Sequence, residues 1–149
     1  KTNPARPPGQ GTNNCLGADT GGFASAGVTP VPSPTPTPSA GSVRMVSVGQ
    51  GGGNAFVDAQ SGNKTTNVRV GDTVQWNWMG GPHSSTSGEC RDSGGPYGGY
   101  DCDNSGIWDS GSHSSSFQYS HTFTEAGTYK YHCEVHGYAM TGTVVVTAQ

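Results

Sequence analysis

A chain of 149 residues is long enough for one ordinary domain with an extension, and two full domains are not expected. Its 25 glycines and 10 prolines, with only 11% charged residues, disfavour helices and favour short strands joined by turns. The net charge of -3 offers no basic surface for nucleic acid, and no apolar run of about 18 residues is present to span a bilayer. We therefore expect a soluble all-β protein.

Residues 1–40 are predicted to be a tail and linker that precede a domain of residues 41–149. Eight of the ten prolines lie in residues 1–38, and they culminate in the segment TPVPSPTPTPS. Alternating prolines fix φ and remove backbone donors, which favours an extended polyproline II spacer. The chain begins at Lys1 without Met, as a processed export does, so we expect an extracytoplasmic protein: periplasmic, cell-surface or secreted.

Short runs of alternating apolar and polar residues begin near Val43 and continue to the C-terminus. In the clearest run, Val74, Trp76 and Trp78 alternate with polar residues, and this period of two indicates a strand with one buried face. Similar runs occupy residues 46–48, 68–70, 117–123, 129–133 and 143–146, with turn-forming sequences between them. Several short strands at such spacing predict a β-sandwich of Greek-key type.

The segment YHCEVHGYAM, residues 131–140, places a thiol, an imidazole and a thioether within eight positions. Cys133 is expected at the inner end of a strand, followed by a loop over residues 134–140 that leads into the last strand. His83, just after the strand that contains Trp78, is the best candidate for a second imidazole. Two His nitrogens and a Cys thiolate in a trigonal plane, with a weak axial Met, form a blue-copper site. The predicted ligands of one type 1 copper ion are His83, Cys133, His136 and Met140.

At these positions the sequence resembles the cupredoxins, particularly small blue copper proteins of the plastocyanin and amicyanin type. The resemblance covers about residues 43–149 and rests on VRVGDTVQWNW, PHSS, FTEAGTYKYHC and HGYAMTGTVVV. It implies a cupredoxin-like sandwich and the same four copper ligands. The sequence departs from the family in two places. Three residues separate His136 from Met140 where relatives have two or four, and Ser84 follows His83 where many relatives carry Asn.

The functional hypothesis is an electron carrier, not an enzyme, that cycles between Cu(I) and Cu(II) and serves redox protein partners. His136 would present its ring edge to solvent, and partners would dock around Gly137, Tyr138 and Ala139. Zinc is disfavoured because Met is a poor zinc ligand. A nucleophilic Cys–His pair is disfavoured because no orienting acid is visible. His113, His121 and His132 match no ligand position and are interpreted as surface or structural residues.

An insertion, residues 87–113, is predicted between the first His and the next strand, and its disulfide-closed part is expected around residues 88–106. Residues 87–113 contain five acidic residues and one arginine. Such a patch could steer a basic redox partner, but a solvated acidic loop is the preferred interpretation. Cys90 and Cys102, with eleven residues between them, are expected to close this loop by a disulfide worth about 3 kcal/mol. A pairing of Cys15 with either of them remains open.

A second hypothesis is an extracellular structural or filament-forming protein in which copper only stabilises the fold. Cys15 is otherwise left over, and an odd Cys in an exported chain suggests an intermolecular bridge or a reactive thiol. Residues 1–40 are long enough to add a strand to a neighbour's sheet edge, which would build a homo-oligomer or filament. An inert tether is the alternative interpretation of the same residues.

Overall fold

The computed structural model describes residues 41–95 and 98–149. The predicted polyproline spacer, the pairing of Cys15 and assembly through residues 1–40 lie outside these residues. Among the described residues the single helical element is the 3-10 turn η1 (Gln50–Gly52), and a helix capable of crossing a bilayer is not found.

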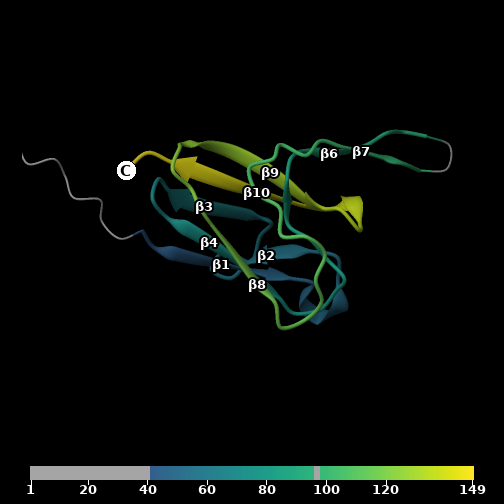
Figure 1. Ribbon diagram of the computed structural model, residues 1–149, viewed down its shortest axis with the longest axis horizontal. Coiled ribbons are helices and arrows are strands. Elements are labelled where there is room, and N and C mark those ends of the chain that lie inside the picture. The colour runs from purple at the N-terminus through teal and green to yellow at the C-terminus, as the bar shows by residue number, and fades with distance from the viewer. Residues whose placement is uncertain (1–40, 96–97) are drawn as a thin grey trace, which may run out of the picture. The chain divides into compact units, whose positions relative to one another are not determined.

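Within residues 41–95 and 98–149, ten strands make up almost all of the regular structure (Figure 1). In chain order they are β1 (Val43–Val48), β2 (Phe56–Asp58), β3 (Thr65–Arg69), β4 (Thr73–Trp78), β5 (Thr86–Ser87), β6 (Cys90–Asp92), β7 (Tyr100–Cys102), β8 (Gln118–Thr122), β9 (Gly127–Cys133) and β10 (Gly137–Thr147). They form a sheet of order β2-β1-β4-β8, a sheet of order β3-β10-β9-β5, and the separate hairpin β6-β7. The pairs β1–β4 and β3–β10 are parallel, and the other pairs are antiparallel. The predicted all-β sandwich is confirmed.

The hydrophobic core lies between the two four-stranded sheets. In β4 the alternation predicted from sequence is present, because Val74, Trp76 and Trp78 are buried and the residues between them are half-buried. Tyr131 of β9 meets Trp76 edge-on, with 5.5 Å between ring centroids. Such aromatic pairs contribute roughly 1 kcal/mol beyond the burial of their area. The two sheets are therefore joined by side chains that alternate inward along each strand.

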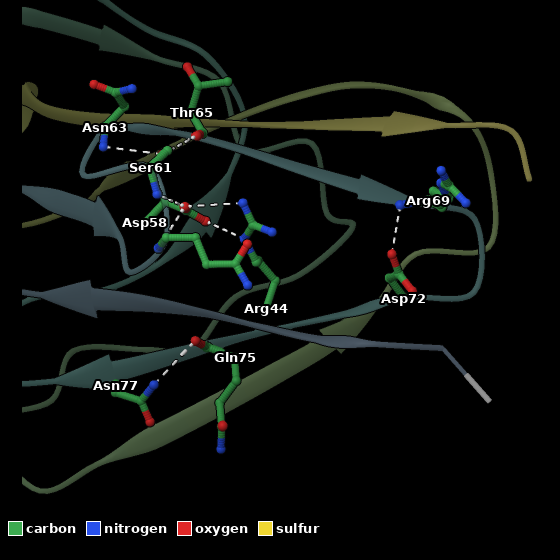
Figure 2. A network of polar contacts seen from close by, with 10 residues as sticks. Arg44, Asp58, Ser61, Asn63, Thr65, Arg69, Asp72, Gln75 and Asn77 are labelled. Carbon is green, nitrogen blue, oxygen red and sulfur yellow. Dashed lines mark hydrogen bonds and ion pairs between the residues drawn. The ribbon is translucent and has the colours of Figure 1, made fainter.

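The turn between β3 and β4 carries the chain from one sheet to the other. Asp72 stabilises this turn, since its carboxylate accepts hydrogen bonds from the backbone N–H of Arg69 at 2.8 Å and of Ser42 at 2.7 Å. The bond between Arg69 and Asp72 is visible in Figure 2. One acidic side chain thus connects the start of β1 with the crossover between the sheets.

Two features of the fold differ from the sequence-based expectation: the start of the last strand and the structure of the insertion. The last strand begins at Gly137 and not after residue 140, because Gly137 already pairs with Cys133 and an irregularity before Thr141 restores the register. The insertion is more ordered than a loop, because β6 and β7 pair and Trp108 is 3% exposed within the core. Cys90 and Cys102 occupy paired positions in this hairpin and form the predicted disulfide.

A partly buried ion pair between Arg44 and Asp58 connects β1 to the end of β2 (Figure 2). Asp58 is 1% exposed, and its carboxylate accepts a hydrogen bond from Arg44 Nε at 3.0 Å. The backbone N–H groups of Gln60 and Ser61 donate to the same carboxylate at 3.1 and 2.8 Å. The charge is therefore compensated both by a cation and by the turn after β2.

Replacement of Asp58 by Asn tests this pair. Burial acts to raise the pKa of Asp58, but hydrogen bonds from Arg44 and Ser61 outweigh it, so the pKa lies below its usual value of 3.8. A lowered folded-state pKa gives stability that is present above the unfolded pKa and is lost as pH falls through the folded pKa. Asp58→Asn should therefore lower the free energy of unfolding by about 2 kcal/mol at pH 7. Urea unfolding of both proteins should show a smaller difference at pH 3, and equal differences at the two pH values would contradict the assignment.

Candidate metal centre

Three of the predicted ligands converge where β9 ends. The ligand atoms of His83, Cys133 and His136 lie within 4.8 Å of one another. The distance between the two Nδ1 atoms is 3.2 Å, and Cys133 Sγ lies 3.4 Å from His136 Nδ1 and 3.9 Å from His83 Nδ1. A point equidistant from the three atoms is about 2 Å from each, which is close to the length of metal–imidazole and metal–thiolate bonds. The triangle therefore has the size needed to hold one metal ion near its plane.

Three hydrogen bonds fix the backbone of His83. Its N–H donates to the carbonyl oxygen of His113 at 2.9 Å, and the N–H of His113 donates back at 2.9 Å. The indole Nε1 of Trp78 also donates to the carbonyl oxygen of His83 at 2.8 Å. Because Trp78 is itself buried in the core, the first ligand is attached to the sandwich and not to a free loop.

A tight turn brings His136 back to Cys133. Cys133 is the last residue of β9, and the N–H of His136 donates to its carbonyl oxygen at 3.2 Å. Gly137 completes the turn with φ of 53°, a left-handed conformation that favours glycine. The ring of Tyr100, from the β6-β7 hairpin, lies against Gly137, where a Cβ would be 2.4 Å from Tyr100 Cδ2. The insertion therefore contacts the residue that directly follows His136.

Gly49 makes room for the first ligand. It comes directly after β1 with φ of 70°, and a Cβ built on it would lie 2.5 Å from His83 Nε2. The sequence indicates only a turn-forming segment, GQGGGN at residues 49–54, because the close approach of an imidazole 34 positions away leaves no local signal. Glycine is required here for both its conformation and its lack of a side chain.

Burial favours the neutral form of the first ligand. Burial, together with the proximity of His136, lowers the pKa of His83 below its usual value. A neutral imidazole has a free lone pair on one nitrogen, which is the form that binds a metal. Cys133 is fully buried, and the N–H of Ser84 donates to its Sγ at 3.3 Å. The site thus offers two imidazole nitrogens and a sulfur with a hydrogen bond.

The remaining predicted residues occupy different places. Met140 is 1% exposed in β10 and belongs to the core cluster that contains Cys133. His132 is buried with its Nδ1 3.1 Å from the carbonyl oxygen of Gly88, and His121 is half-buried on β8 beside Trp108. Neither His132 nor His121 belongs to the group formed by His83, Cys133 and His136.

The residues proposed for partner docking are only partly accessible. Gly137 is buried beneath Tyr100, whereas Tyr138 is 52% exposed and Ala139 is exposed. Val135, which the sequence did not single out, is 46% exposed in the same turn. His136 itself is half-buried.

Residues 55–147 match the family described as copper binding proteins, plastocyanin/azurin family. The chain belongs to this family. Its members are typically electron carriers, and the His83–Cys133–His136 group is positioned to bind one copper ion.

Solved structures of cupredoxins resemble the chain at low identity. A Cu(I) form of an amicyanin variant is 30% identical, with 72% of this chain and 84% of that chain covered and a TM-score of 0.44. A second amicyanin variant in the Cu(I) state is 28% identical over 70% and 81% of the two chains, with a TM-score of 0.45. A purple cupredoxin from Nitrosopumilus maritimus is 23% identical over 71% and 99%, with a TM-score of 0.47. No curated protein matches the chain.

Substitution of Gly49 by Ala should disturb the first ligand. The new Cβ would collide with the imidazole of His83, and we expect the copper dissociation constant to rise about tenfold, equivalent to about 1.4 kcal/mol. Gly51→Ala is the matched control, because Gly51 also has a positive φ of 68° but has no atom within 4 Å of the added Cβ. Copper titration of both variants makes the comparison. An equal loss of affinity in the two variants would show that backbone strain, and not contact with His83, is responsible.

Proposed function

We propose that the chain is a type 1 copper protein that carries single electrons. The observation that carries this proposal is the convergence of two imidazole nitrogens and one buried thiol sulfur in a triangle with edges of 3.2, 3.4 and 3.9 Å. Two His ligands and one Cys in a trigonal arrangement are characteristic of blue-copper electron-transfer sites. Copper, when bound, supplies the one-electron chemistry between Cu(I) and Cu(II).

The protein residues provide a fixed set of ligands. His83 is attached to Trp78 and His113 through its backbone, and Cys133 lies in the core at the end of β9. Packed interiors resist rearrangement, so the ligand positions should change little between the two oxidation states. We assign His83, Cys133 and His136 as the equatorial ligands and Met140 as the axial ligand. The axial assignment rests on the burial of Met140 in the same core cluster as Cys133.

The half-buried His136 is the proposed route for electrons to and from redox protein partners. It lies in the turn flanked by the exposed side chains of Val135 and Tyr138. We therefore retain docking around Gly137, Tyr138 and Ala139, with Tyr138 and Ala139 as the accessible members. The disulfide between Cys90 and Cys102 supports an extracytoplasmic location, because such bonds persist in oxidising compartments.

The competing functions receive less support. A nucleophilic role for Cys133 would need access for a substrate, but this thiol is 0% exposed. Zinc would not explain a buried Met in the same core cluster as the thiol, since its usual ligands are Cys, His and carboxylate groups. The structural or filament-forming alternative concerns residues 1–40 and stays a prediction outside the described residues.

Addition of Cu(II) to the purified protein should produce an intense blue thiolate-to-Cu(II) absorption band at one copper per chain, and reduction should bleach it. Cys133→Ser should abolish the band, because the sulfur ligand is the electron donor in this transition. A variant with both Cys90 and Cys102 replaced by Ser is the control and should remain blue. A colourless wild-type protein, or a blue Cys133→Ser variant, would refute the proposed function.

Two substitutions of Met140 separate an axial ligand from a simple core residue. Met140→Gln should keep the copper and lower the reduction potential, because an oxygen ligand stabilises Cu(II) more than a thioether does. We expect about 60 mV, a tenfold change in a one-electron equilibrium. Met140→Leu preserves hydrophobicity and size but supplies no ligand, so it should raise the potential. Voltammetry measures both values, and potentials unchanged from wild type in both variants would mean that Met140 is not axial.

A further inference from the structure

Ser84 contacts the Cys133 side of the metal centre through two of its groups. Its backbone N–H donates to Cys133 Sγ at 3.3 Å, and its side-chain Oγ accepts a hydrogen bond from the N–H of Glu134 at 2.8 Å. Ser84 is 0% exposed, so neither bond has water as a ready substitute. Glu134 lies in the turn between Cys133 and His136. One serine therefore links the segment of the first ligand to the turn that carries the other two.

The hydroxyl of Ser84 continues into a chain of hydrogen bonds with a fixed direction. Thr86 Oγ1 donates to Asp109 Oδ1 at 3.1 Å, and this uses its only hydroxyl proton. In the 3.1 Å contact between Ser84 Oγ and Thr86 Oγ1, Ser84 must therefore be the donor. The Glu134 N–H therefore donates to Ser84, Ser84 donates to Thr86, and Thr86 donates to the carboxylate of Asp109. Each hydroxyl donates to one neighbour and accepts from the other, which strengthens the chain cooperatively.

The Asp109 end of this chain of hydrogen bonds lies in the insertion. Asp109 and Thr86 form a backbone bridge, and Asp109 Oδ1 also accepts from the N–H of Gly111 at 2.9 Å. The preceding residue, Trp108, is buried against Trp76 at a centroid distance of 5.4 Å. The carboxylate thus has a defined position although Asp109 is exposed.

We infer that Thr86 and Asp109 are positioning residues of the metal centre that act through Ser84, and that the insertion, through Asp109, fixes the turn between Cys133 and His136. This inference rests on the proposed copper function and deepens it. Loss of the Thr86 hydroxyl leaves Ser84 without its acceptor and frees it to rotate away from the Glu134 amide. The hydrogen bond from Ser84 N–H to the thiolate then weakens. A thiolate with more electron density stabilises Cu(II), so the reduction potential falls.

Ser87 provides a control for general loosening of the insertion. It lies in β5 with Thr86 and is 1% exposed. Its Oγ donates to the carbonyl oxygen of Trp108 at 2.9 Å and accepts from the N–H groups of Ile107 and Trp108, both at 3.0 Å. Ser87 therefore anchors the same insertion to the same strand, but its side-chain bonds all go to the insertion and not to the turn between Cys133 and His136.

The test compares Thr86→Val, Thr86→Ser and Ser87→Ala with the wild-type protein. In the metal-free protein, Thr86→Val should speed hydrogen exchange of the Glu134 amide about tenfold, as measured by NMR. In the copper form it should shift the thiolate band and change the Cu(I)/Cu(II) equilibrium about tenfold toward Cu(II). Thr86→Ser should restore both properties, and Ser87→Ala should lower stability without either change. Asp109→Ala, at the exposed end of the hydrogen-bond chain, should change both properties in the same direction as Thr86→Val. It replaces Thr86→Val in the test if that variant does not fold.

The inference is overturned if Thr86→Val or Asp109→Ala leaves the exchange of the Glu134 amide unchanged. It is also overturned if Ser87→Ala changes the Glu134 amide exchange and the reduction potential as much as Thr86→Val or Asp109→Ala does. Exchange in the metal-free protein does not depend on copper. A wild-type protein without a blue band would therefore refute the proposed function, while the hydrogen-bond chain would still be judged by the exchange measurement.

Discussion

The contact between Trp76 and Tyr131 fixes the position of the metal centre within the sandwich. Trp76 comes from one sheet and Tyr131 from the other, and their rings meet edge-on across the core at 5.5 Å. Two residues after Trp76 in β4 comes Trp78, whose indole holds the backbone of His83. Two residues after Tyr131 in β9 comes Cys133. Since side chains repeat every two residues along a strand, this one aromatic contact sets the separation of two ligand-bearing segments.

A second feature of the metal centre is the run of buried serines and threonine that follows His83. Residues 84–87 are each no more than 1% exposed, although the sequence SSTS is typical of a solvated loop. The burial of these polar side chains is tolerated because the insertion supplies hydrogen-bond partners. Ser85 N–H donates to Ser110 Oγ at 2.8 Å, and Trp108 Nε1 donates to Ser85 Oγ at 3.1 Å. The insertion is therefore part of the architecture of the metal centre, and not an appendage to it.

The sequence predicted those features whose signal is local or chemically specific. The alternation in β4 indicated its buried face, and the order His83, Cys133, His136 indicated a site because these residue types suit one metal. Trp108 was missed because, apart from the adjacent Ile107, it lies among Gly, Ser, Asn and Asp residues and has no periodicity to mark it as core. The start of β10 was placed too late because its register shift depends on pairing with β9. The contact of Gly49 with His83 is likewise purely tertiary.

Strand β1 also determines where the chain enters the domain relative to the metal. Its first residue, Val43, pairs with Thr73 beside the crossover that Asp72 stabilises, and its last residue, Val48, directly precedes the Gly49 that touches His83. A six-residue strand spans about 20 Å, so the start of β1 lies at the opposite end of this strand from His83. A partner domain attached at Gly41 would therefore leave the end that carries His83, Cys133 and His136 pointing away from the attachment.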